Sequence, residues 1–241
     1  MPGSKLEVVC WSAPTVGRNL ALDDALARAA WESGRRVLRF WWGGPPTVVM
    51  GSGEWPDQVV NEAACARLGV EVLKRSTGGG SVLQTSGVLN YALVTPAPAG
   101  LDLKRAFRLG TDLICAILDA FDLIGTPEGT SDVAVGGRKI SGNAQARRWK
   151  ALLVHGTLLV DFDHALAEAA LKHPPREPEY RRGRGHREFM VTLHELGVSA
   201  DRNTIEQTAI EAARAAFPNM MVTSQPTSRK VPYAVPAEVV Q

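Results

Sequence analysis

The sequence predicts an α+β fold built as one large domain. Segments with the two-residue period of strands and segments with the helical period follow one another, without the regular strand–helix alternation of a parallel α/β sheet. The chain has 241 residues, of which 45% are hydrophobic and 22% charged, which is enough to bury a full core. No segment repeats another, so a repeat architecture is excluded.

Hydrophobic spacing separates the elements in the first half of the chain. Leu22, Ala25 and Leu26 lie on one helical face, and we expect Asn19 to be the N-cap of that helix. Two short β-rich runs flank the Gly-Gly-Pro turn at 43–45. The expected strands cover residues 6–10, 36–42, 46–51, 70–75 and 88–95, and the expected helices cover 19–29 and 59–68.

The second half of the chain continues the same mixture. A strand at 133–135 precedes a Gly-Gly pair of the kind found in hairpin turns. A strand pair is expected within 152–162. A long amphipathic helix is expected over 103–121, and a closing helix over 203–217 has Asn203 as its expected N-cap.

Two segments lack any period. Residues 172–188 are rich in Pro, Arg and Gly and should form a loop of about 15 residues, a length that usually indicates function or disorder. The arginine-rich stretch 176–187 is expected to be mobile, and either meets an acidic partner or is simply solvated. The tail from Thr223 on is rich in Pro and Ser and should fray. We therefore expect one domain over 1–220 and a short tail over 221–241.

Charge and cysteine content limit the kinds of partner and site that we expect for this protein. Lys and Arg total 27 and Asp and Glu total 25, so the net charge of +2 does not favour a nucleic-acid or membrane partner. Cys10, Cys65 and Cys115 are too few and too widely spaced for a disulfide framework or a paired Cys metal site. No apolar run approaches the roughly 20 residues of a membrane span, and the N-terminus lacks a signal sequence. A reducing, cytoplasmic setting is expected.

The first candidate site is a strand that runs into three consecutive glycines. Backbone N–H groups of Gly78, Gly79 and Gly80 can approach an anion closely, and the guanidinium of Arg75 suits a phosphate bidentately. An isolated Gly triplet is more often a plain turn. The spacing fits neither a Walker loop nor the dinucleotide-binding fingerprint.

Two further segments carry polar residues in small or apolar surroundings. Lys139 follows the Gly-Gly turn and precedes small residues, so it can supply a point charge to phosphoryl or carboxylate oxygens. Alone, such a lysine is more often a solvated edge residue. His155 and Thr157 interrupt an apolar strand, where a lone His is usually a hydrogen-bonded core residue.

Taken together, these segments resemble the catalytic domain shared by lipoate-protein ligases, octanoyl and lipoyl transferases and biotin ligases, and most closely the lipoate-protein ligase A family. The Gly triplet alone is weak, but Arg75 with three glycines, then Arg-Lys-Ile-Ser-Gly, then His-Gly-Thr-Leu-Leu is a specific combination. The matching segments are 19–23, 38–41, 46–51, 75–80, 87–91, Asp132, 137–142 and 155–159, so the resemblance covers most of the chain up to about residue 220.

The resemblance implies a fold similar to that of biotin and lipoate ligases, with a mixed or antiparallel central sheet and flanking helices. It implies an enzyme that activates lipoate or octanoate with ATP to an acyl-adenylate. The acyl group would then pass to a lysine of a lipoyl carrier domain, such as the E2 component of 2-oxoacid dehydrogenases or the glycine cleavage H protein. Mg²⁺ is expected to be held largely by the phosphates, without a protein metal site. Nucleic acid and membrane are not expected as partners.

The same resemblance assigns roles to residues. Lys139 would be catalytic, contacting the activated carbonyl and the phosphate, where a fixed cation relieves developing negative charge. Asp132 would line the nucleotide side and can orient Lys139. An apolar tunnel for the acyl chain would include Trp41, Val82 and Leu89. The residues expected to bind substrate and adenylate are Arg75, Gly78, Gly79, Gly80, Ser81, Asn90, Ser131, Asp132, Ser141, Gly142, His155 and Thr157.

The chain also departs from the family pattern. Gln84-Thr85 stands where the ligases usually carry His-Asp, and the segment 51–54 reads Gly-Ser-Gly-Glu where they carry Gly-Arg/Lys-x-Gln. Any role of these positions in nucleotide or acyl positioning is therefore open. The chain ends near where the accessory domain of the larger ligases would begin, so we expect that unit to be a separate polypeptide or to be unnecessary.

Alternatives stay open. A cofactor-free transferase would move octanoyl or lipoyl groups through a cysteine thioester, but residues 124–131, where ligase-like transferases carry that cysteine, contain none. A non-catalytic module would hold an acyl-carrying partner; the departures at 51–54 and 84–85 favour it, whereas Arg75, Lys139 and the glycines favour an enzyme. A biotin ligase is disfavoured because the Gly-Arg-rich stretch at 182–187 follows the lysine segment instead of preceding it.

Overall fold

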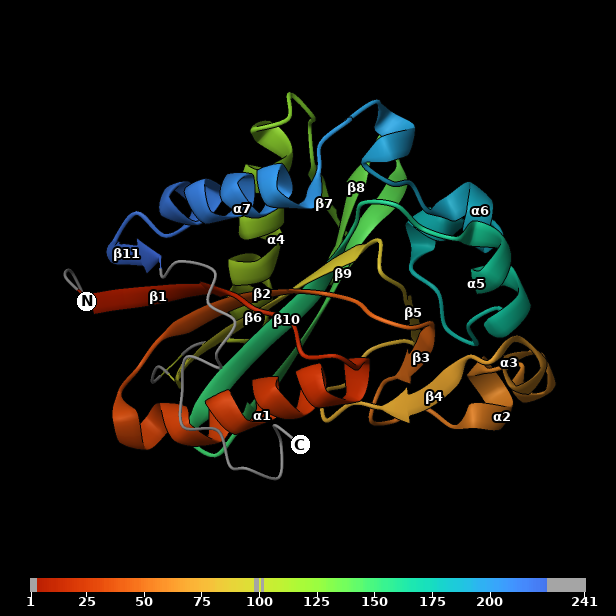
Figure 1. The fold of residues 1–241 in the computed structure, drawn as a ribbon, viewed down its shortest axis with the longest axis horizontal. Helices are drawn as coiled ribbons and strands as arrows, with labels where there is room; N and C mark the ends of the chain where they lie inside the picture. The colour runs from red at the N-terminus through yellow and green to blue at the C-terminus, as the bar shows by residue number, and fades with distance from the viewer. Residues whose placement is uncertain (1–3, 98–99, 101, 225–241) are drawn as a thin grey trace.

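The computed structural model describes residues 4–97, 100 and 102–224, which form two β-sheets with helices around them (Figure 1). The larger sheet has the strand order β11-β1-β2-β6-β10-β9-β8-β7, and the smaller has the order β4-β3-β5. The strands are β1 (Ser4–Cys10), β2 (Val37–Trp42), β3 (Thr47–Met50), β4 (Glu71–Lys74), β5 (Val82–Gln84), β6 (Val88–Pro96), β7 (Thr126–Glu128), β8 (Asp132–Val135), β9 (Arg138–Arg148), β10 (Ala151–Leu159) and β11 (Met220–Ser224).

Both sheets mix parallel and antiparallel pairs. In the larger sheet, β1 runs parallel to β11 and to β2, whereas every pair from β2 across to β7 is antiparallel. In the smaller sheet, β3 is parallel to β4 and antiparallel to β5. The predicted class, an α+β fold with a mixed sheet and flanking helices, is therefore confirmed.

Helices cover both faces of the larger sheet. α1 (Val16–Ser33) packs against β6 and β10 from one side, and α4 (Leu103–Asp119) packs against β9 and β10 from the other, with α7 (Arg202–Ala216) beside α4 (Figure 1). The remaining helical segments are α2 (Pro56–Val59), α3 (Glu62–Leu68), α5 (His164–Ala170) and α6 (His186–Phe189), with 3₁₀ turns η1 (Glu179–Arg181) and η2 (His194–Leu196). No described helix is both long and apolar enough to cross a bilayer.

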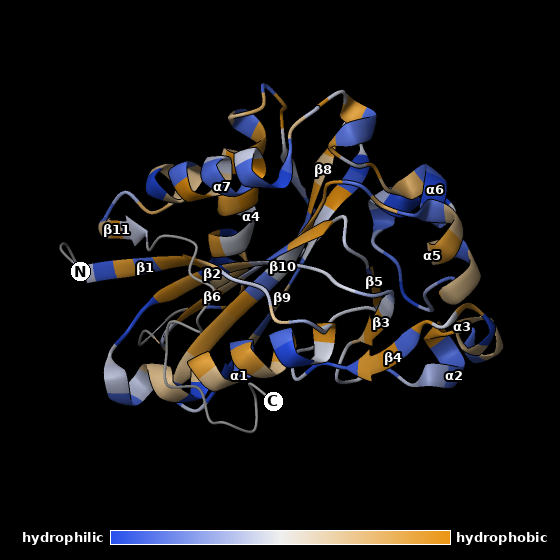
Figure 2. Ribbon diagram, viewed as in Figure 1, coloured by the Kyte–Doolittle hydropathy of each residue, from blue (hydrophilic) through white to orange (hydrophobic). Residues whose placement is uncertain are grey.

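The central strands are buried on both sides. Along β6, Leu89 and Leu93 pack into the core that includes α4 and α7, whereas Ala92 and Val94 pack toward α1. This two-residue period is what a strand covered on both faces requires. Helix α7 alternates hydrophobic and hydrophilic residues, as expected of a helix with only one face on the core (Figure 2).

The structure corrects both predicted helix caps. α1 begins at Val16, and its N-cap is Thr15, not Asn19. α7 is capped by Asp201, not Asn203. In each helix the capping oxygen accepts from the backbone N–H three residues later, which is the usual capping geometry.

Other boundaries also differ from the predicted ones. The helix expected over 59–68 is divided, because Asn61 caps α3 after α2 has ended. The pair expected within 152–162 is the single strand β10. Residues 221–224 of the predicted tail belong to β11, which pairs with β1, and residues 225–241 lie outside the described residues.

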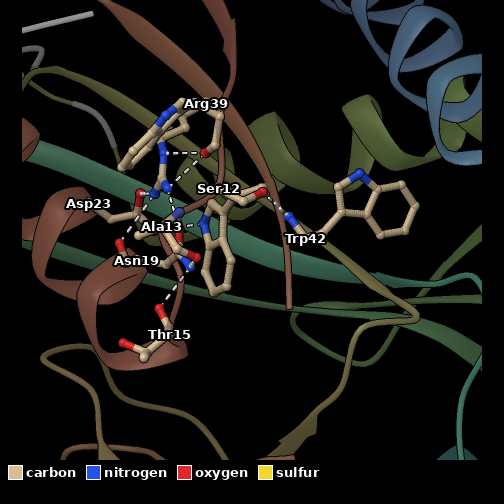
Figure 3. Close-up of polar contacts among 9 residues, drawn as sticks. Ser12, Ala13, Thr15, Asn19, Asp23, Arg39 and Trp42 are labelled. Carbon is tan, nitrogen blue, oxygen red and sulfur yellow. Dashed lines mark hydrogen bonds and ion pairs between the residues drawn. The ribbon is translucent and has the colours of Figure 1, made fainter. Parts of the chain in front are cut away.

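Asn19 belongs instead to a buried polar network (Figure 3). Arg39 Nη1 lies 2.7 Å from Asp23 Oδ1, and both side chains are 1% exposed. The Arg39 guanidinium also donates to Trp11 O, Asn19 O and Asn19 Oδ1. Trp41 Nε1 donates to Asp23 Oδ2 over 3.1 Å. The network joins α1 to β2 and holds the Trp41 ring. Segments 19–23 and 38–41, which carry part of the family resemblance, therefore have a structural role in this network.

Candidate active site

A cavity of about 450 Å³ is bounded by residues of both sheets and of residues 172–190, the covering segment. A volume of this size suits a small-molecule ligand. Every predicted site residue except Gly78 lines it: Arg75, Gly79, Gly80, Ser81, Asn90, Ser131, Asp132, Lys139, Ser141, Gly142, His155 and Thr157. Strands far apart in sequence thus bring the three predicted segments to one cavity.

Part of the cavity wall is apolar. Trp41 and Val49 pack together with Leu20 and Val82, and all four line the cavity. Trp41 and Val82 therefore belong to the apolar part of the wall, and their contact with an acyl chain stays a prediction. Leu89 does not line the cavity and packs into the main core.

The glycine loop is held by Arg75. Its Nη2 donates to Gly78 O (2.6 Å) and Gly80 O (2.9 Å), its Nη1 to Val49 O, and its Nε to Thr77 Oγ1. These bonds occupy the guanidinium N–H groups that were expected to bind a phosphate. Burial lowers the pKa of Arg75 to about 10, so it stays cationic at neutral pH. Arg75 therefore supports the loop, and its direct contact with an adenylate stays a prediction.

The loop also depends on two glycines and an acid. A Cβ on Gly51 would lie 1.9 Å from Gly79 O, so only glycine allows this close approach, and Gly79 has a φ of +90°. Glu54 Oε2 accepts from Gly51 N–H and from Ser81 Oγ, both over 2.8 Å. Glu54 was not among the predicted site residues, although it is one of the two residues, with Ser52, that depart from the family pattern at 51–54.

Lys139 lies at the start of β9, immediately after the Gly136-Gly137 turn. Both glycines have φ values in the left-handed region, +56° and +73°, so the predicted hairpin is confirmed. A Cβ on Gly142 would lie 2.9 Å from both Cε and Nζ of Lys139. The small residue at 142 therefore makes room for the lysine side chain along the cavity wall.

The Lys139 ammonium forms an ion pair with Asp132. Nζ lies 2.8 Å from Asp132 Oδ1, and the lysine side chain is 26% exposed. The second carboxylate oxygen, Oδ2, accepts from the Tyr180 hydroxyl over 2.9 Å. Tyr180 comes from the covering segment, and sequence reasoning did not single it out because the pattern around it carries no period.

His155 is a neutral, hydrogen-bonded residue. Its Nε2 lies 2.7 Å from Thr77 Oγ1, which already accepts from Arg75 Nε. The threonine proton is thus free to be donated to an unprotonated Nε2. Burial, with the nearby Arg75 charge, lowers the pKa of His155 to about 3. The chain Arg75–Thr77–His155 links the glycine loop to β10.

Three amide side chains organise the rest of the wall. Asn90 and Gln84 exchange both amide hydrogen bonds, over 2.8 and 2.9 Å. Asn143 Nδ2 donates to Ser131 O, and Asn143 Oδ1 accepts from the Tyr91 hydroxyl. Gln84 stands where the ligases usually carry a histidine, and it fixes the orientation of Asn90. Asn143 and Tyr91 were not among the predicted site residues.

Ser141 presents an unused polar group to the cavity. Its side chain is buried and lines the cavity, yet Oγ has no hydrogen-bond partner among the described residues. A buried hydroxyl without a partner is costly unless a ligand or water completes it. Ser141 therefore fits a ligand-contacting position.

The arginine-rich stretch differs from the expected mobile loop. Arg181 is buried and its Nε donates to Arg184 O, while Arg184 Nη2 donates to Tyr180 O and Gly137 O. α6 begins within the stretch at His186. These contacts make the covering segment a wall of the cavity, attached to the turn that precedes Lys139.

The cysteines lie away from this site. All three are within the described residues, and none lines the cavity. Cys10 and Cys65 are buried, and half-buried Cys115 on α4 contacts Gly125 O. Burial raises the pKa of Cys10 to about 12 and also raises the pKa values of Cys65 and Cys115. Thiols with raised pKa values in such surroundings are poor nucleophiles.

The cavity carboxylates are already engaged. Glu54 binds the glycine loop, Asp132 binds Lys139 and Tyr180, and Glu177 accepts from Gly183 N–H. No group of three or more His, Cys, Asp or Glu side chains in the described part of the chain is arranged to hold a metal. These residues therefore do not fit a protein-held Mg²⁺ site.

Comparison with known proteins gives a family match. The family model described as "Lipoyl protein ligase A/B catalytic domain" matches residues 15–214. A protein of Aeropyrum pernix named "Putative lipoate-protein ligase A" is 35% identical over 145 residues, which cover 60% of this chain and 54% of the relative. The match thus spans about half the length of that relative.

Two further similar proteins are covered over most of their length. The octanoyltransferase LipM of Geobacillus kaustophilus is 27% identical over 230 residues, covering 83% of this chain and 78% of the relative. A solved structure of lipoate-protein ligase A bound with ATP superposes with a TM-score of 0.78 at 22% identity, covering 93% of this chain and 90% of the other. The structural match shows a shared fold.

Proposed function

Because this chain belongs to the lipoyl protein ligase A/B catalytic domain family, we propose that it is an ATP-dependent ligase that attaches lipoate or octanoate to a lysine of a lipoyl carrier domain. The observation that carries the proposal is that the Lys139–Asp132 pair and the Gly79–Gly80 backbone line one cavity, which no cysteine lines. A fixed cation and the backbone of a glycine loop in one cavity suit charge that develops on phosphoryl and carbonyl oxygens.

In the first step, a carboxylate oxygen of the acid attacks the α-phosphorus of ATP. The new carbon–oxygen–phosphorus linkage forms as the bond to pyrophosphate breaks. The ammonium of Lys139 would offset the negative charge that builds on the phosphoryl oxygens. Asp132 keeps the lysine side chain against the wall, and the apolar wall around Trp41 would receive the acyl chain.

In the second step, the amine of the carrier lysine attacks the acyl carbonyl. An amide forms and AMP leaves, carrying the electron pair of the broken carbon–oxygen bond, while the attacking amine gives up one proton to solvent. Lys139 would again face the developing oxyanion, now together with the loop N–H groups. Mg²⁺, if it accompanies the nucleotide, would be bound mainly by phosphate oxygens, since the cavity carboxylates are engaged.

Acid-dependent pyrophosphate release tests this proposal. Wild type should release pyrophosphate from ATP with lipoate or octanoate but not without an acid. Lys139→Ala should lower the rate by about 100-fold or more, the usual cost of removing a group that stabilises the transition-state charge. Lys104→Ala, a lysine in the exposed first turn of α4, is the matched control and should behave as wild type. Absence of release by wild type with either acid, with or without a carrier domain, would refute the ligase.

A second candidate is the cofactor-free octanoyl or lipoyl transferase, which the match to LipM over 83% of the chain favours. It requires a cysteine that accepts the acyl group as a thioester. Cys115 is the cysteine with the most exposure, so it is the residue to test. Transfer of octanoate between two carriers without ATP, with an acyl group found on a cysteine by mass spectrometry, would identify this activity.

The proposed partners are lipoyl carrier domains. Arg176, Arg182 and Arg187 are exposed on the covering segment, and Arg176 also lines the cavity. Their charge suits an acidic surface on a carrier that must bring its lysine to the cavity. A separate accessory polypeptide stays a proposal, which activity measurements with the purified chain alone would address.

A further inference from the structure

We infer that Tyr180 is a positioning residue, which holds Asp132 and, through Asp132, the Lys139 ammonium from the covering segment. The inference rests on the proposed function for the role of Lys139. Its structural basis is the chain of contacts from Tyr180 through Asp132 to Lys139. The covering segment thereby contributes to the reaction without its tyrosine touching the reacting atoms.

Asp132 depends on this contact because it is buried. The residue is 8% exposed, and its two oxygens have different partners: Oδ1 lies 2.8 Å from Lys139 Nζ and Oδ2 lies 2.9 Å from the Tyr180 hydroxyl. Without the hydroxyl, Oδ2 would lose its protein donor, and the carboxylate could rotate about its side-chain bonds. An acid that orients a catalytic group usually needs such a partner of its own.

The orientation of the Tyr180 side chain is also fixed by its neighbours. The ring packs on Phe189 with 5.0 Å between ring centroids. Arg184 binds the Tyr180 carbonyl over 2.8 Å and the Gly137 carbonyl over 3.0 Å. Arg184 thus attaches the backbone of Tyr180 to the turn from which Lys139 emerges.

The end of the covering segment is attached to Lys139 from the other side. Val191 N–H donates to Lys139 O over 2.9 Å, and Arg138 Nη2 donates to Met190 O over 2.7 Å. The main chain of Lys139 is therefore held by the residues that end the segment, and its side chain is held through Tyr180 in the middle. If the middle of the segment lifted, Tyr180 and Asp132 would separate while the end stayed bound.

The kinetic test uses Tyr180→Phe, which removes the hydroxyl and keeps the ring on Phe189. We expect kcat for acid-dependent pyrophosphate release to fall about 10-fold, with KM for ATP and for the acid within about threefold of wild type. Glu179→Gln, an exposed neighbour in the same turn, is the matched control and should match wild type. A kcat within twofold of wild type, or a loss that appears only in KM, would overturn the inference.

A second test needs no catalysis. Hydrogen exchange followed by mass spectrometry would compare wild type, Tyr180→Phe, Asp132→Asn and the double variant. We expect faster exchange across the β8–β9 hairpin in Tyr180→Phe, and no additional change when it is combined with Asp132→Asn, because both act through one contact. Equal changes in both backgrounds, or none in either, would refute the coupling. Wild type without pyrophosphate release would refute the ligase alone, since the exchange result stands by itself.

Discussion

Two aspartate–cation pairs of nearly equal length have different surroundings in this molecule. Arg39 and Asp23 are 2.7 Å apart with both side chains 1% exposed, and Lys139 and Asp132 are 2.8 Å apart with side chains 26% and 11% exposed. The Arg39 guanidinium is surrounded by protein acceptors, whereas the Lys139 ammonium borders a cavity. The difference teaches that a short ion pair indicates chemistry only where a charged group retains hydrogen-bonding capacity toward a space that a ligand can enter.

Removing the cation from each pair should give the largest difference between the two pairs, measured as the loss in the free energy of unfolding. Arg39→Met leaves Asp23 buried without its charge partner, and we expect the free energy of unfolding to fall by about 3–5 kcal/mol. Lys139→Met leaves the buried Asp132 beside the cavity with the Tyr180 hydroxyl as its donor, so we expect a smaller loss of about 1–2 kcal/mol. Urea unfolding of both variants measures this. A loss of similar size at both sites would contradict the distinction.

Arg75 lies between the two cases, because it is buried yet lines the cavity, and its neighbour His155 makes stability depend on pH. The pKa of His155 is about 3 in the fold, below its ordinary value of 6.5, so the unfolded chain binds more protons between these values. Stability should therefore decrease as pH falls from about 6.5, by up to about 1.4 kcal/mol per pH unit. Urea unfolding from pH 7 to pH 4.5 would show this slope.

His155→Gln is the variant that isolates this effect. Glutamine can accept from Thr77 but does not titrate, so the slope below pH 6.5 should become shallower than in wild type. His173→Gln, at an exposed position of the covering segment, supplies the control. An unchanged slope in His155→Gln would mean that other groups determine the acid sensitivity.

The smallest expected effect concerns Cys115. Cys115→Ser should leave acid-dependent pyrophosphate release within about twofold of wild type, because the thiol does not line the cavity and its pKa is raised. Its weak contact with Gly125 O can be kept by the serine hydroxyl. Steady-state rates and the melting temperature together distinguish loss of chemistry from loss of fold. A selective loss of acyl transfer would instead support the transferase.

Local signals in the sequence were sufficient for most of the longer elements and for part of the site. The Gly136-Gly137 turn is encoded by two adjacent residues that tolerate positive φ, so the hairpin that carries Lys139 could be predicted without tertiary information. Arg75 and His155 stood out from their neighbours in the sequence, and the resemblance supplied their expected place in one site. The structure adds that both belong to one hydrogen-bonded chain through Thr77.

The remaining site residues could not be found this way because their roles depend on contacts distant in sequence. Tyr180 is 48 positions from Asp132, and nothing near it predicts where its hydroxyl points. Asn19 precedes an apolar helical pattern, as a cap would, but the Arg39 guanidinium from β2 competes for its oxygen. Local sequence preferences depend on residues that are adjacent along the chain. The positions of these side chains depend instead on contacts with other helices and strands.

The pairing of β1 with β11 has a consequence for how the chain reaches its fold. Ser4 pairs with Met220 in parallel register, so the first strand of the sheet finds its outer neighbour only after almost all of the described chain is available. Contacts of such long sequence separation carry a large loop-closure cost and slow folding. During synthesis, that edge of β1 would stay open until the last strand emerges, so it is exposed to pairing with other chains for longer than the other edges that end up inside the sheet.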